Sequence, residues 1–132
     1  MDEEILQRAM ILQQQSQEAE KQLAFVDEQI VELEEFGKNL GFMEASKEKE
    51  VLASLGKGVF VKSDIKDKKL FVDVGAGVLV RKTASEAGKV IEGQLAKFRE
   101  ARVQIAERLE DFREELGFMI EEIEKLKAEQ KS

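Results

Sequence analysis

Two stretches of this chain carry the same apolar pattern, in alternating steps of four and three residues, on either side of a short segment with a different period. The first stretch runs through Ile5, Ala9, Leu12, Ser16, Ala19, Leu23, Val26, Ile30, Leu33, Gly37 and Leu40. The second runs through Ile91, Leu95, Phe98, Arg102, Ile105, Leu109, Phe112, Leu116, Met119, Ile123, Leu126 and Gln130. A repeat that averages about 3.5 residues is typical of a coiled coil, and we call these positions the seam. The pattern predicts two long helices.

The two seams match when one of them is read backwards. Leu40 is then opposite Ile91, and Ile5 is opposite Leu126. The small seam residues face large ones, as Ala19 faces Phe112, which keeps the volume of each layer nearly even. The chain contains no proline, so nothing in either stretch forces a break. We therefore predict that the helices fold back on each other as an antiparallel coiled-coil hairpin.

The segment between the helices has the period of a β-strand. Apolar residues occur at every second position, and Gly56-Lys57-Gly58, residues 66–69 and Gly75-Ala76-Gly77 interrupt them. The glycines are typical of turns, since neither motif has the strand–helix context or the Gly-Lys-Ser/Thr ending of a phosphate-binding loop. We predict two β-hairpins, from four strands near residues 51–55, 59–65, 70–74 and 78–82.

Two hairpins in one short chain bury little apolar surface, and an isolated hairpin is marginal in water. We therefore predict that residues 51–82, which we call the β block, assemble with the same block of other subunits. The alternative is a sheet within one chain, covered by the ends of the helices. The residues predicted to mediate oligomerisation are Val59, Phe60, Val61, Leu70, Phe71, Val72, Val74, Val78, Leu79 and Val80.

Charge is distributed unevenly along the 132 residues. Residues 1–50 carry 13 acidic and 5 basic side chains, residues 51–82 carry 3 and 7, and the remainder carry 12 and 9. Acidic helices argue against a nucleic-acid partner, because phosphate contacts need clustered cations. The alternative of nucleic-acid binding would use five lysines of the β block, which are Lys57, Lys62, Lys66, Lys68 and Lys69.

The composition also bears on location and chemistry. No apolar run approaches the roughly 20 residues that cross a bilayer, and the acidic N-terminus is unlike a secretory signal, so we expect a cytoplasmic protein with no membrane partner. Histidine, cysteine, tyrosine and tryptophan are absent, which removes the usual nucleophile–base pairs and most metal ligands. We expect no catalytic residues, no metal and no cofactor, and therefore no enzyme.

Surplus apolar residues gather where the two predicted helices end away from the β block. Some lie outside the seam, and others belong to its last layers. We call this set the tip, and it consists of Ile5, Leu6, Met10, Ile11, Phe118, Ile120, Ile123 and Leu126. Exposed apolar surface tends to mark a binding site, and methionine adapts to unlike partners. The alternative is that these side chains only widen the seam or pack on a neighbouring subunit.

The order of these segments resembles the alpha-class subunit of prefoldin. The resemblance rests on a helix of several heptads, the sequence Val51–Lys62, a lysine-rich turn, the sequence Val72–Val80, and a second long helix beginning near residues 85–87. It covers essentially the whole chain, and two hairpins between equal helices distinguish the alpha class from the beta class. Ala53-Ser54 stands where the family often has Val-Pro, which leaves open a divergent relative that assembles with another partner or with itself.

The resemblance implies an α+β fold in which a long antiparallel helical coiled-coil hairpin carries two β-hairpins that oligomerise into a β-barrel body. It implies one prefoldin-like domain over residues 1–132, divided at 1–50, 51–82 and 83–132. It also implies two alpha and four beta subunits in a hexamer, which holds unfolded polypeptides at its tips without ATP and delivers them to a group II chaperonin. The alternative function is a structural protein, a filament or spacer built through the same β block.

Overall fold

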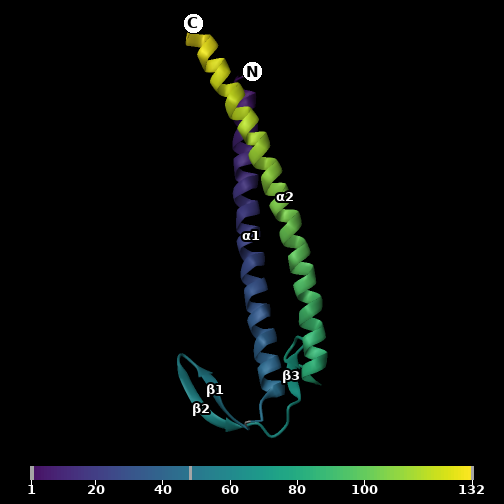
Figure 1. The fold of residues 1–132 in the computed structure, drawn as a ribbon. Helices are drawn as coiled ribbons and strands as arrows, with labels where there is room; N and C mark the ends of the chain where they lie inside the picture. The colour runs from purple at the N-terminus through teal and green to yellow at the C-terminus, as the bar shows by residue number, and fades with distance from the viewer. Residues whose placement is uncertain (1, 48, 132) are drawn as a thin grey trace. The chain divides into compact units, whose positions relative to one another are not determined.

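The computed structural model describes residues 2–47 and 49–131. The chain forms two long helices with four strands between them, as Figure 1 shows. The elements are α1 (Asp2–Ala45), β1 (Glu50–Gly56), β2 (Val59–Asp64), β3 (Leu70–Asp73), β4 (Leu79–Lys82) and α2 (Ala84–Lys131). The predicted fold, two long helices and two β-hairpins, is confirmed. Each strand begins and ends within one residue of its predicted position.

The chain divides into two compact units, and each contains part of both helices. Met1–Val31 and Ala96–Ser132 form the first unit, and Glu32–Leu95 form the second. The β-hairpins belong to the second unit. That residues 1–132 form one domain, with segment boundaries after residues 50 and 82, stays a prediction. Helix α1 ends at Ala45, before the first of these boundaries.

The core of the first unit consists of seam residues from both helices. Ala19, Val26, Ile105 and Leu109 are buried, and Leu23, Ile30, Phe98 and Phe112 pack against them. Arg102, which interrupts the apolar pattern, is exposed, and its Nε lies 2.6 Å from Oδ1 of Asp27. The predicted seam is confirmed here, because the buried residues occupy seam positions. The charged exception lies at the surface of the interface, where it forms an ion pair.

Ser16 is the polar exception in this seam. Its side chain is buried, and among the described residues no hydrogen-bond partner reaches its Oγ. A buried hydroxyl without a partner lowers stability. The seam therefore tolerates this residue for its small size rather than for a polar contact.

The second unit has its own core where the helices meet β3. Leu40, Ala87 and Ile91 are buried, and Leu33, Met43, Leu70 and Leu95 pack against them. Gly37 lies close to the opposite helix, since a Cβ placed on it would be 4.0 Å from Cγ2 of Ile91. Leu70 joins this core from β3, so the second hairpin is packed on the helices of its own chain.

Each pair of strands is an antiparallel hairpin. β1 pairs with β2, and β3 pairs with β4, with Ala53 opposite Val61 and Val72 opposite Val80. Both turns have three successive residues with positive φ, at residues 56–58 and 75–77. Glycine adopts this conformation without strain, which explains why each turn is flanked by glycines. The prediction that these motifs form turns is confirmed.

The helix ends in the second unit are capped by side chains. The last turn of α1 has no basic residue, and Nζ of Lys68 donates hydrogen bonds to the carbonyl oxygens of Glu44 and Ser46, at 2.9 and 3.1 Å. At the start of α2, Oγ1 of Thr83 accepts a hydrogen bond from the backbone N–H of Glu86 and donates one to its carboxylate, both at 3.1 Å. These contacts satisfy backbone groups that a helix leaves unpaired, and they fix where α1 ends and where α2 begins.

Candidate functional site

The tip contains both exposed and half-buried apolar side chains. Leu6, Met10, Ile11, Phe118 and Ile120 are 48–69% exposed. They lie outside the seam on helices whose seam positions already provide the packing. This part of the chain therefore presents apolar surface that the fold does not use.

The other three tip residues continue the seam. Ile5, Ile123 and Leu126 are half-buried, whereas seam residues farther along α1, such as Leu12 and Ala19, are buried. Burial thus decreases along the seam toward the tip. These three residues combine packing in the seam with partial exposure, and their part in binding stays a prediction.

The β block presents apolar side chains on both faces of its first hairpin. Val59, Phe60 and Val61 are 44–57% exposed although successive residues of a strand point to opposite faces. The first hairpin therefore has little apolar cover from its own chain.

The second hairpin is covered on one face only. Leu70 and Val72 are half-buried, and they share a face with Val80. On the opposite face, Phe71 and Leu79 are more than 60% exposed, and the guanidinium of Arg81 lies 5.7 Å from the centre of the Phe71 ring. The alternative predicted a sheet within one chain that the helix ends cover. Such cover is found on one face of the second hairpin. Val74 and Val78 in its turn are also exposed.

Sequence reasoning missed two residues of this surface. Leu52 and Leu55 of β1 are 65% and 70% exposed, more than the predicted residues of β2. The sequence does indicate these two residues, because apolar side chains occupy both odd and even positions of residues 51–55 and therefore both faces of the strand. A strand that is apolar on both faces needs cover on both faces.

An apolar groove of about 380 Å³ lies beside the second hairpin. Its walls come from α1, α2 and the hairpin. The lining residues are Leu33, Phe36, Leu70, Phe71, Val72, Lys82, Ala87, Val90, Ile91 and Gln94. Phe36 and Val90 are each 49% exposed, so the exposed apolar surface continues from the β block onto the helix ends of the second unit.

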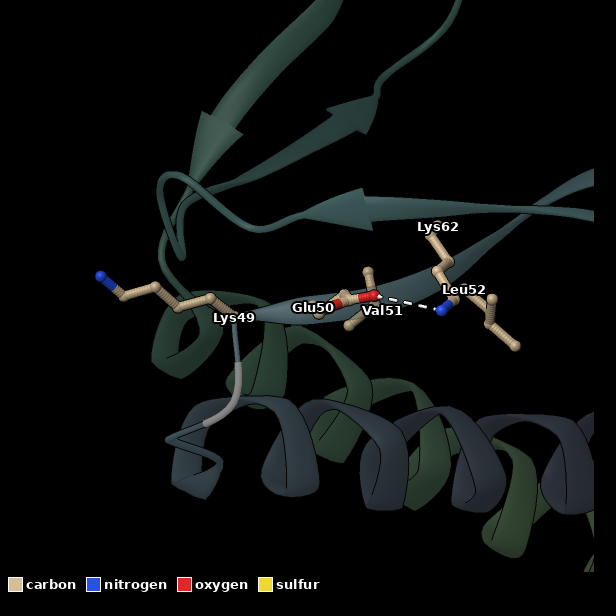
Figure 2. Close-up of a pocket in the computed structure, with 5 residues that line it drawn as sticks. All are labelled: Lys49, Glu50, Val51, Leu52 and Lys62. Atoms are coloured by element: carbon tan, nitrogen blue, oxygen red, sulfur yellow. Dashed lines mark ion pairs between the residues drawn. The ribbon is translucent and has the colours of Figure 1, made fainter.

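The lysines of the β block differ in their surroundings. Nζ of Lys62 lies 3.8 Å from a carboxylate oxygen of Glu50 in a hollow at the start of β1 (Figure 2), and Lys68 is bound to the end of α1. Lys57 is in the first turn. Two of the five lysines suggested for nucleic-acid binding therefore have partners within the chain.

Asp67 has the most perturbed electrostatic surroundings among the described residues. A hydrogen bond from the backbone N–H of Lys69, at 3.0 Å, is the main cause that lowers the pKa of the Asp67 carboxyl, and the nearby charge of Arg81 lowers it further. Arg81 also forms an ion pair with Asp67. This contact joins the segment before β3 to strand β4.

Other kinds of site find no support in residues 2–47 and 49–131. No group of acidic side chains there is arranged to hold a metal ion. No helix in the same ranges has the length and apolar content needed to cross a bilayer.

Comparison with known proteins agrees with the fold. A search of curated protein sequences gave no significant match. The cryo-EM structure of a filamentous prefoldin (PFD) from Methanocaldococcus jannaschii matches with a TM-score of 0.70 and 20% sequence identity, over 91% of this chain and 98% of that one. At that identity the match speaks for the fold alone. The profile of the prefoldin subunit family matches residues 12–129, nearly the whole length, and the chain therefore belongs to the prefoldin family.

Proposed function

We propose that this protein is a subunit of an ATP-independent chaperone that holds unfolded polypeptides at its tip. Proteins of the prefoldin family act as chaperones rather than as enzymes. The observation that carries the proposal is the exposure of Leu6, Met10, Ile11, Phe118 and Ile120 beside a seam that packs without them. An unfolded client offers apolar side chains to such a surface, and burying them is favourable without a nucleotide.

The subunit is assigned to the alpha class, with two alpha and four beta subunits in a cytoplasmic hexamer. Prefoldin subunits assemble with other prefoldin subunits. The support for the class is the pair of hairpins, and the support for assembly through the β block is the exposed apolar surface of β1–β2 on both faces. Strands that are marginal alone become stable when neighbouring strands complete the sheet.

Assembly and binding are connected by multivalency. A single tip offers few exposed side chains, and a client would leave it quickly. Several tips on one assembly act at high effective concentration, so a client released by one is held by the others. Weak contacts at each tip also permit transfer, and we propose a group II chaperonin as the recipient.

The test replaces Leu6, Met10, Ile11, Phe118 and Ile120 with serine. We expect the variant to keep its assembly mass, measured by light scattering, and to lose suppression of the aggregation of a chemically unfolded client. The matched control replaces Phe25, Val31 and Val103, which are exposed apolar residues elsewhere on α1 and α2, and should suppress aggregation normally. Full suppression by the tip variant, or equal loss in the control, would contradict the proposal.

A second candidate function is a filament built from this chain alone. Two observations favour it: β1–β2 is uncovered on both faces, and the solved structure with the same fold is described as filamentous. Light scattering of the purified chain separates the candidates. A mass that grows with concentration supports the filament, whereas a closed complex that forms only after a beta-class subunit is added supports the chaperone hexamer.

A further inference from the structure

A second, basic hollow of about 370 Å³ lies where α1 ends and the segment between β2 and β3 passes it. Its lining contains four lysines and one acid. The lining residues are Ala45, Ser46, Lys47, Lys49, Ile65, Lys66, Asp67 and Lys68. The formal charge of this lining is positive, in a chain whose net charge is −7.

The walls of this basic hollow are held by hydrogen bonds. The backbone N–H of Ile65 donates to the carbonyl oxygen of Lys49 at 2.6 Å, and Lys68 binds the carbonyl oxygens at the end of α1. Asp67 is occupied by the backbone N–H of Lys69 and by Arg81. The segment around residues 65–68 is thus fixed at several points, and the shape of the hollow does not depend on a ligand.

The four lysines differ in what they contact among the described residues. Lys68 neutralises the negative end of the α1 dipole, which would otherwise repel an anion. Within the described part of the chain, Lys47, Lys49 and Lys66 have no ion-pair partner, and all three are exposed. Figure 2 shows the Lys49 side chain directed away from the Glu50–Lys62 ion pair. These three cations face solvent around a fixed hollow.

We propose that the basic hollow binds an acidic, extended polypeptide segment. Lys47, Lys49 and Lys66 would pair with its carboxylates, and the aliphatic side chains of Ala45 and Ile65 would contact its backbone and β-carbons. The acidic helices would repel such a segment, and the positive charge of the lining distinguishes this hollow from them. The lining contains no aromatic side chain on which a base could stack, which favours a peptide over single-stranded nucleic acid.

The probe is a fluorescently labelled peptide of alternating glutamate and serine, and fluorescence polarisation measures its binding to the full protein at low salt. The combined variant Lys47→Ser, Lys49→Ser and Lys66→Ser should bind about tenfold more weakly, since each exposed pair contributes modestly. Lys68 is left unchanged because it caps α1. The matched control is the variant Lys38→Ser, Lys57→Ser and Lys89→Ser, which loses the same charge elsewhere and should bind within about twofold of the parent protein.

Several outcomes decide the proposal. Site-specific weakening in the first variant, with helical circular dichroism unchanged, supports it. Equal weakening in both variants shows a general charge effect and overturns it. A labelled oligothymidylate that binds as tightly as the peptide also overturns it, as does the absence of peptide binding. The basic hollow and the tip are made of different residues, so the variant that lacks the three lysines should still suppress client aggregation.

Discussion

The two hairpins have the same connection and nearly the same turn, but they differ in what covers them. The β3–β4 hairpin places Leu70 in a core with Leu40 and Ile91. The β1–β2 hairpin has exposed apolar residues on both faces, including Leu52 and Phe60. A strand pair of this size is marginal by itself, so the proposed assembly with other chains would stabilise the first hairpin more than the second.

This difference assigns separate roles within the β block. The second hairpin is anchored to the helices by Leu70 and by the capped helix ends, and only its outer face remains for a neighbour. The first hairpin has exposed apolar residues on both faces. We infer that β3–β4 defines the base of the subunit and that β1–β2 is the part that reaches into other subunits.

The largest expected effect comes from removing apolar surface of the first hairpin. Replacing Leu52, Leu55 and Phe60 with serine should abolish assembly, because these apolar side chains are 57–70% exposed in the single chain. Light scattering with candidate partner subunits measures the loss. The variant Phe25→Ser, Val31→Ser and Val103→Ser serves as the control, and it should assemble normally. An unchanged mass for the hairpin variant would show that β1–β2 is not the principal contact.

Sequence patterns predicted most of the fold because they are local and repeated. The step of four and three residues placed the seam, and even its interruption at Arg102 has a local explanation in the ion pair with Asp27. Strand period and glycine turns placed the hairpins. Each of these features depends on residues close in sequence, which is why one sequence was enough.

The difference between the hairpins was not predictable in the same way. Leu70 packs on the cluster of Leu40, Ala87 and Ile91, which is distant in sequence, and alternation alone does not show which strand receives cover. The role of Lys68 was also hidden, since the sequence presents it as one lysine in a basic turn. Its contacts with Glu44 and Ser46 arise only when the segment before β3 folds back to the end of α1.

A smaller effect is expected from the covered hairpin. Leu70→Ala should lower the free energy of unfolding by about 1.5 kcal/mol, since the side chain is half-buried and full burial gives about 2–5 kcal/mol. Leu52→Ala should change it by less than about 0.5 kcal/mol in a dilute sample that light scattering shows to be monomeric. Denaturant unfolding followed by circular dichroism provides both values. Equal losses in the two variants would mean that the hairpins do not differ in cover.

The smallest effect concerns the ion pair that ties the segment before β3 to strand β4. The pKa of Asp67 is lowered in the folded protein, first by the N–H of Lys69 and then by Arg81. Its contribution to stability is therefore fully present above the ordinary aspartate pKa of about 3.9 and is lost as the pH falls through the lower folded value. The difference in Tm between the parent protein and Asp67→Asn should be small near neutral pH and should disappear in acid. A difference that persists or grows in acid would indicate that the asparagine acts by another contact. Because Asp67 is exposed to solvent, added salt should reduce the neutral-pH difference, whereas the effect of Leu70→Ala, which rests on packing, should remain.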